Sequence, residues 1–177
     1  MDTKHLMVEI RQEEANDFPA VYDVNFKAFK RKVEARLVDR LRLSKAFIPE
    51  LSLVATIGKK VVGHILFTKI MIVDGDKETP SLALAPMAVV PDMQREGVGT
   101  KLIHYGFDKA KELGYKSVIV FGHAEYYPKL GFVPTSKWQI KPPYNVPENS
   151  FLGIELIKDG LTGVKGTVRY SKEFEEI

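Results

Sequence analysis

Three apolar stretches follow one another in the middle of the chain, at residues 51–57, 60–73 and 81–90. They are rich in Val, Ile, Leu and Phe, which is the composition of buried strands. Only residues 58–59 and 74–80 separate them, with a turn at 74–76 in the second case, and connections this short join strands that run antiparallel. A doubly wound sheet alternates strands and helices, so three consecutive strands favour a mixed, mostly antiparallel sheet instead.

Helical and strand patterns alternate around this centre. The clearest helix covers residues 97–113, where small and apolar residues recur at spacings of three and four, and Gly114 follows it. We expect further strands at 7–11, 117–121, 151–157 and 166–170, further helices at 18–29, 33–46 and 125–130, and a proline-rich loop at 139–150. The order β-α-α-β-β-β-α-β-α-β-β predicts an α/β fold of the mixed α+β type, in which helices flank both faces of a central mixed sheet.

Composition limits the classes of protein and of site. The 177 residues contain no linker or repeat, which predicts a single domain over residues 1–177. The chain has no cysteine, which excludes disulfides, thiolate metal sites and a cysteine nucleophile. The remaining candidates, His5, His64 and His104, lack metal-ligand spacing, so we expect no metal.

Charge and hydropathy narrow the partners and the location. The net charge of +3 suits an anionic small ligand but lacks the clustering of a nucleic-acid binder. The amino terminus opens no apolar signal core, and no apolar run reaches the ~20 residues of a membrane span. We therefore expect a cytoplasmic protein that binds neither nucleic acid nor a membrane.

A glycine-containing turn lies between the third central strand and the clearest helix. Gly97 and Gly99 stand where the helix begins, and the first turn of a helix offers unpaired N–H groups and a partial positive charge. Such a turn can hold a phosphate group. The nucleotide P-loop pattern is absent, and the dinucleotide fingerprint fails because its third glycine is replaced by Leu102. Two glycines alone are equally compatible with an ordinary flexible helix start.

The wider sequence resembles the GNAT superfamily of N-acetyltransferases. Residues 84–102 are similar to its acetyl-CoA motif, Gln/Arg-x-x-Gly-x-Gly/Ala after an apolar strand and a proline, here with Gln94, Gly97 and Gly99. Residues 127–132, Tyr-Pro-Lys-Leu-Gly-Phe, look like the family's Tyr-x-x-x-Gly-Phe segment. The resemblance covers residues 7–170, and the carboxyl-terminal part is similar to a poorly characterised bacterial branch.

This resemblance implies a binding mode for acetyl-CoA. The fourth and fifth strands of the family separate, and pantetheine lies in the gap along the fourth-strand backbone, here Met87, Ala88 and Val89. The pyrophosphate would lie on backbone amides at the helix start, at Arg95, Glu96, Gly97, Val98, Gly99 and Thr100.

The resemblance also implies the chemistry. The acetyl group passes directly from the thioester to a primary amine, and Tyr127 holds the position of the acid that protonates the departing thiolate. The neighbouring Tyr126 is expected to point elsewhere, as a packing residue or a wall of the substrate site.

Two departures from the family pattern leave alternatives open. An Asn that often contacts the cofactor before the tyrosine is absent, and residues 81–90 hold no carboxylate that could act as general base. The base is then a water chain, His123, Glu125 or a residue of the first two helices such as Glu34. The main alternative function is a catalytically idle acyl-CoA-binding sensor or regulatory module, and a second alternative is an ATP-binding protein.

The expected partners are a small-molecule or peptide amine acceptor and, in a homodimer, a second copy of the chain. Acceptor walls come from loops and helices that vary freely on a shared fold, so the sequence does not name the amine. It also leaves open whether acyl groups other than acetyl are used.

Overall fold

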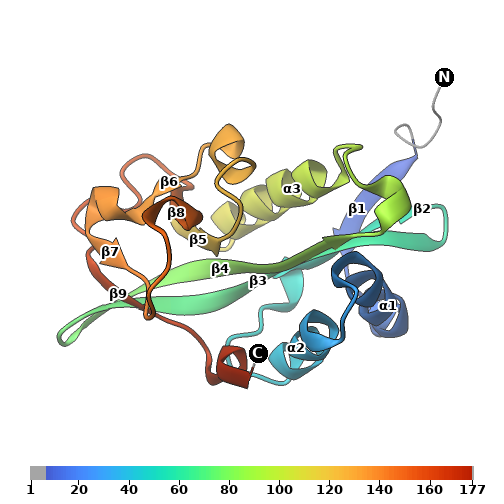
Figure 1. Ribbon diagram of the computed structural model, residues 1–177, viewed down its shortest axis with the longest axis horizontal. Helices are drawn as coiled ribbons and strands as arrows, with labels where there is room; N and C mark the ends of the chain where they lie inside the picture. The colour runs from blue at the N-terminus through green and yellow to red at the C-terminus, as the bar shows by residue number, and fades with distance from the viewer. Residues whose placement is uncertain (1–6, 177) are drawn as a thin grey trace.

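The middle of the chain folds into the expected antiparallel hairpins. In the computed structural model, which describes residues 7–176, β2 (Ser52–Ile57), β3 (Lys60–Asp74) and β4 (Lys77–Val89) pair consecutively and antiparallel. Gly58 and Gly75 adopt the left-handed conformation in the two turns, each with a φ of 59°, which a residue without a Cβ adopts without steric cost. The long strands β3 and β4 form the centre of the sheet (Figure 1).

Shorter strands complete the sheet on both sides of this centre. The main order is β1-β2-β3-β4-β5-β8-β6, while β9 pairs with β3 and β7 pairs with β9. Among the described strands, β4–β5 and β7–β9 are the parallel pairs and the others are antiparallel. The predicted mixed, mostly antiparallel sheet is confirmed. The bounds are β1 (Val8–Gln12), β5 (Ser117–Phe121), β6 (Val133–Pro134), β7 (Ile140–Lys141), β8 (Phe151–Glu155) and β9 (Gly166–Arg169).

Helices cover both faces of the sheet, as expected. Figure 1 shows α1 (Phe18–Phe29) and α2 (Val33–Arg42) on one face and α3 (Val98–Glu112) on the other. A Cβ built at Gly106 of α3 would lie 2.2 Å from the ring of Phe67. The backbone of α3 therefore approaches β3 at a distance that only glycine permits.

The second helix is shorter than its sequence pattern predicts. It ends at Arg42 and not at residue 46. The hydroxyl of Ser44 donates to the Leu41 carbonyl oxygen at 2.8 Å. This side chain satisfies a carbonyl that another helical turn would otherwise have paired.

Two further boundaries differ in the carboxyl-terminal half. The helix expected at 125–130 is a 3₁₀ turn, Tyr127–Leu130, because the segment is short and Pro128 supplies no N–H. The expected loop at 139–150 contains β7, whose Ile140 is buried in one core cluster with Val168 of β9. This strand depends on packing against residues far along the chain, so the proline-rich sequence around it does not predict it.

The parallel pairing of β4 with β5 is short. It joins only Leu82 with Val118 and Ala83 with Ile119. The register between β3 and β4 shifts directly afterwards, where two residues of β4, Ala85 and Pro86, oppose one of β3, Leu66, and such a bulge bends and twists its strand. Pro86 lies in this bulge and has no N–H for a neighbouring strand. The two strands therefore separate beyond Ala83, while β5 stays paired with β8 as far as Phe121.

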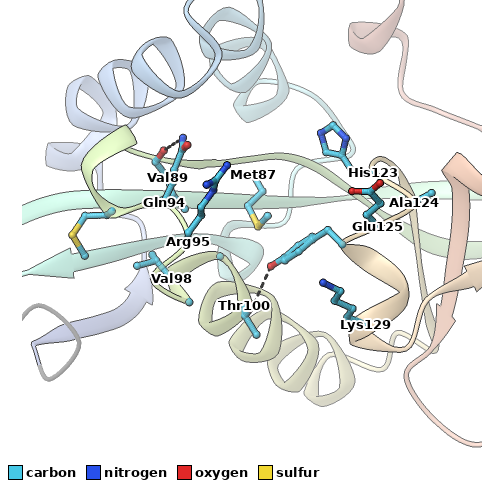
Figure 2. A pocket seen from close by; sticks show the side chains of 14 residues that line it. Met87, Val89, Gln94, Arg95, Val98, Thr100, His123, Ala124, Glu125 and Lys129 are labelled. Carbon is cyan, nitrogen blue, oxygen red and sulfur yellow. Dashed lines mark hydrogen bonds between the residues drawn. The ribbon is translucent and has the colours of Figure 1, made fainter. Parts of the chain in front are cut away.

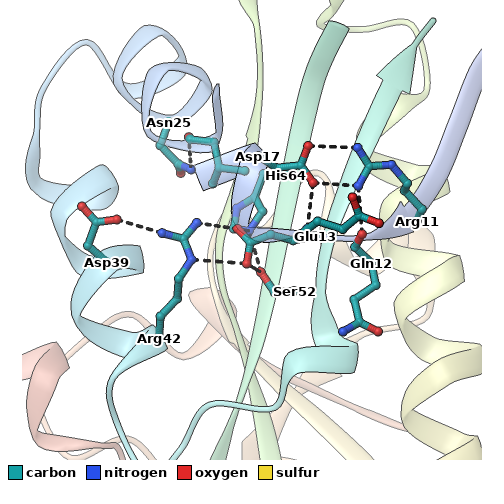
Figure 3. A network of polar contacts seen from close by, with 11 residues as sticks. Arg11, Gln12, Glu13, Asp17, Asn25, Asp39, Arg42, Ser52 and His64 are labelled. Atoms are coloured by element: carbon teal, nitrogen blue, oxygen red, sulfur yellow. Dashed lines mark hydrogen bonds and ion pairs between the residues drawn. The ribbon is translucent and has the colours of Figure 1, made fainter. Parts of the chain in front are cut away.

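A buried polar cluster joins the start of β2 to α2 (Figure 3). The Arg42 guanidinium donates to the carboxylate of Glu13, with Nε at 3.2 Å from Oε2. The Ser52 hydroxyl also donates to Glu13, at 2.7 Å, and lies 3.0 Å from Nε2 of His64. Since the proton of Ser52 is directed to Glu13, Nε2 of His64 carries a hydrogen and donates to Ser52. A single tautomer of His64 therefore fits this cluster.

Burial controls the charge of His64. Its side chain is completely buried, and burial, together with the positive charge of Arg42, lowers its pKa from 6.5 to about 3. The unfolded chain binds a proton near pH 6.5, whereas the folded chain does not until far lower pH. This residue therefore makes no difference to stability above pH 6.5 and destabilises the fold increasingly as the pH falls below it.

We expect the free energy of unfolding to fall by about 2 kcal/mol between pH 7.5 and pH 5 on account of His64 alone. His64→Gln should reduce this pH dependence, and the exposed His104→Gln serves as the matched control that leaves it intact. Urea unfolding at several pH values measures the slope. An unchanged slope in His64→Gln would contradict the burial argument.

Candidate functional site

A cleft of about 950 Å³ lies where β4 separates from β5 (Figure 2). One wall is the end of β4 with the loop into α3, and the other is the segment 123–129 after β5. Seven of the ten predicted site residues line it together: Met87, Val89, Arg95, Gly97, Val98, Gly99 and Thr100. Met93, Gln94, His123, Ala124, Glu125, Tyr126 and Lys129 complete the lining.

The start of α3 presents backbone N–H groups to this cleft. Gly97 is the N-cap with a φ of 82°, and Arg95 also has a positive φ, of 65°. The first intrahelical bond runs from the Lys101 N–H to the Gly97 carbonyl oxygen at 3.1 Å. The preceding amides, those of residues 98–100, are the unpaired donors of the first helical turn. Together with the helix dipole they favour an anion at this wall.

Gly99 keeps the floor of the cleft free of side chains. A Cβ at this position would lie 3.3 Å from the sulfur of Met87 and 3.5 Å from the hydroxyl oxygen of Tyr126. Both neighbours belong to the cleft lining, so any longer side chain at Gly99 would extend into the cleft itself.

Cationic and polar side chains stand around the helix start. Arg95 and Lys129 line opposite walls, and Glu125 is the acidic residue of the lining (Figure 2). The side-chain amide of Gln94 donates to the Val89 carbonyl oxygen at 2.9 Å. This hydrogen bond holds the loop before α3 against the end of β4.

Tyr126 connects the two walls of the cleft. Its hydroxyl lies 3.0 Å from Oγ1 of Thr100, so the turn after β5 is hydrogen-bonded to α3 (Figure 2). Tyr126 lines the cleft whereas Tyr127 does not, and the two rings meet edge to face with their planes 74° apart. Tyr126 faces α3 because the segment after β5 forms a tight 3₁₀ turn. The spacing of residues in the sequence does not predict this turn.

Tyr127 is buried beside the cleft and does not belong to its lining. Its ring packs against the backbone of Gly122, where a Cβ would lie 2.4 Å from Cε2, and against Phe132 at 5.5 Å between ring centroids. Burial is the main cause that raises the pKa of Tyr127 above the usual 10, with a smaller contribution from Tyr126. The phenol is therefore protonated throughout the neutral pH range.

The remaining expected residues lie as follows. Glu96 does not line the cleft. Ala88 is buried and sits opposite His64 of β3, so its side chain points away from Met87 and Val89. Its backbone remains part of the strand edge at the opening.

The three side chains considered as general bases are separated. His123 and Glu125 line the cleft, whereas Glu34 is buried on α2 and accepts a hydrogen bond from Nε of Arg31 at 2.6 Å. Glu34 is therefore held in an ion pair with Arg31, which lies just before α2.

Over residues 7–176, no three His, Asp or Glu side chains gather in a way that could hold a metal ion; the expectation that none binds stays a prediction. Within the same part of the chain, no helix has the length and apolar character to cross a membrane.

Several known proteins are similar to this chain in sequence and in architecture. The model of the acetyltransferase (GNAT) family matches residues 9–132. The uncharacterized N-acetyltransferase YjhQ of Escherichia coli strain K12 is 40% identical over 135 residues, 75% of this chain and 74% of its own. The uncharacterized N-acetyltransferase YhbS of the same strain is 30% identical over 166 residues, 93% of this chain and 97% of its own.

Solved structures agree with the sequence relatives. The structure of YhbS from Escherichia coli in complex with CoA has a TM-score of 0.89 at 28% identity and covers 96% of this chain and 92% of its own. A GNAT-family acetyltransferase from Brucella melitensis in complex with acetyl-CoA has a TM-score of 0.77 at 30% identity, with coverages of 94% and 97%. The resemblance seen in the sequence is confirmed: the chain belongs to the GNAT family of acetyltransferases.

Proposed function

We propose that this protein binds acetyl-CoA in the cleft between β4 and β5 and transfers the acetyl group directly to a primary amine. The observation that carries the proposal is the separation of β4 from β5 next to the first turn of α3. Gly99 in that turn has no side chain, which leaves the cleft open at this point. The two solved relatives that hold CoA and acetyl-CoA support it.

The cofactor would be held mainly by backbone groups. The amides of residues 98–100 and the cation of Arg95 suit the pyrophosphate, since both offer positive charge. The backbone of residues 87–89 suits pantetheine, because β4 has no strand partner on that edge beyond Ala83. A side chain that points away, such as that of Ala88, does not interfere with this binding mode.

The transfer step needs two proton movements. The neutral amine nitrogen attacks the thioester carbonyl carbon, a C–N bond forms, the C–S bond breaks, and the thiolate sulfur leaves with the electron pair. The amine gives up a proton to a base, for which His123 and Glu125 are the candidates in the cleft. We propose Tyr127 as the acid that protonates the sulfur, because its phenol stays protonated at neutral pH and its ring lies against Gly122 at the end of β5. Burial also makes this phenol a weaker acid than an exposed tyrosine, since it raises the pKa.

Tyr127→Phe should reduce kcat by roughly 10²–10⁴-fold, because it removes the proton donor and keeps the ring. Acetyl-CoA affinity should change little. The matched control is Tyr126→Phe, which removes the hydrogen bond to Thr100 and should affect cofactor affinity more than kcat. The measurement is thiol release across pH with an amine that turns over. Wild-type kcat in Tyr127→Phe, with chemistry rate-limiting, would exclude Tyr127 as the acid.

Gly99→Glu should weaken CoA binding at least about tenfold, or about 1.4 kcal/mol. The reason is that it places bulk and a negative charge where the pyrophosphate should lie. Gly99→Ala is the control, since a single methyl group meets the flexible end of Met87 and lies at ordinary contact distance from the hydroxyl of Tyr126. Isothermal titration gives both affinities, and circular dichroism verifies the fold. Equal CoA affinity in a folded Gly99→Glu protein would move the anion site elsewhere.

One observation favours a second candidate, an acyl-CoA-binding module without catalysis. The part of β4 that borders the cleft carries no carboxylate, and its Glu78 lies at the other end, paired with Arg169 at 2.8 Å. Thiol release from acetyl-CoA with and without a panel of amines distinguishes the two candidates.

A further inference from the structure

A second cavity, of about 610 Å³, lies on the face of the sheet opposite α3. Its lining includes Phe121 and Val168. Leu84 of β4 lies opposite Phe67, whose ring approaches α3, so the neighbouring Ala83 points to the other face of the sheet. Ile119 pairs with Ala83, Phe121 shares the face of Ile119, and Val168 belongs with Ala83 and Ile119 to the second core cluster. The cavity and the cofactor cleft therefore occupy different faces of the sheet.

Four aromatic side chains from separate segments form the cavity. Phe121 and Tyr144 meet edge to face at 6.1 Å between centroids, Tyr144 and Tyr170 are nearly parallel at 6.4 Å, and Tyr170 and Phe174 lie 5.2 Å apart. Phe121 and Tyr144 keep 52% and 47% of their surfaces exposed. Large rings left this exposed beside a cavity are typical of a ligand site.

The cavity begins where the cofactor cleft ends. Phe121 lines the cavity, and two residues further along the chain His123 lines the cleft. Both stand at the end of β5, across from the bulge in β4, where the two strands no longer pair. A molecule in the cavity thus lies next to the opening through which a thioester would be reached.

The charges of the cavity suit a cation better than an anion. The guanidinium of Arg169 is paired with Glu78 at 2.8 Å. Glu175 adds a carboxylate to the lining. Burial is the main cause that raises the pKa of Tyr170, so that phenol is neutral. Aromatic faces carry partial negative charge and attract ammonium groups.

We propose that this cavity receives the amine acceptor and that the acceptor is an arylalkylamine, a primary amine on an aromatic body. The rings of Tyr144, Tyr170 and Phe174 would pack against that body, and the amine would point to the opening between β4 and β5. The role of acceptor site rests on the proposed acetyl transfer. The binding of an aromatic amine in the cavity does not depend on that transfer. A longer acyl chain on CoA is the competing occupant.

The first test uses a probe that cannot be acetylated. Phenethyltrimethylammonium is titrated calorimetrically into the CoA-saturated protein, with 3-phenylpropionate as the anionic counterpart of similar body. We expect the cation to bind and the anion to bind at least about tenfold more weakly. Tyr144→Ala and Phe174→Ala should each weaken the cation about tenfold. Tyr105→Ala, on α3, should have no effect, and CoA affinity should stay unchanged in all three.

The second test uses turnover. We expect phenethylamine to exceed ethylamine and glutamate in kcat/KM, and Tyr144→Ala to raise KM for phenethylamine alone. Binding of the probe without any turnover would support the cavity assignment and contradict the acetyl transfer. The cavity assignment would be overturned if the Tyr144→Ala and Phe174→Ala proteins acetylated amines as the wild type does, or if the probe did not bind. The cavity assignment would also be overturned if Tyr144→Ala changed the preference between acetyl-CoA and hexanoyl-CoA and left the preference among amines unchanged.

Discussion

The arrangement of this protein depends on the point where β4 stops pairing with β5. The ladder ends at Ala83 and Ile119, because the following residues of β4 bulge and include a proline that cannot donate a hydrogen bond. A continuous sheet would leave no passage from one face to the other. The break leaves an unpaired strand edge, the cleft beside α3 and an aromatic cavity on the opposite face.

The buried polar cluster contributes to this arrangement from a distance. Glu13, just after β1, is paired with Arg42 at the end of α2, and both side chains are almost fully buried. Breaking a buried pair leaves an uncompensated charge, so these partners fix α2 against the sheet edge. The carboxyl-terminal turn Lys172–Glu176 in turn contacts α2 and carries Phe174 to the aromatic cavity. A cluster far from the cleft thereby helps to shape the proposed acceptor site.

Local patterns were sufficient to predict the hairpins and the helix after the glycine turn. The resemblance to the GNAT family added seven of the residues that line the cleft. Gly97 and Gly99 indicate an anion site because a helix start has the same physical properties in any fold. Contacts between distant segments were not predictable in this way. The four rings of the cavity come from residues 121, 144, 170 and 174, and the partners of His64, Ser52 and Arg42, come from β2 and α2. The orientation of Tyr126 depends on a 3₁₀ turn in place of the expected helix.

The central claim is that CoA occupies the opening of the sheet with its pyrophosphate on the first turn of α3. The most direct measurement is a titration of the ¹⁵N-labelled protein with CoA, followed by amide chemical shifts, with ATP as the comparison ligand. We expect the largest shifts at the amides of residues 97–100 and 87–89, with a weaker response to ATP. Shifts that leave these amides unchanged, or that appear equally with ATP, would contradict it.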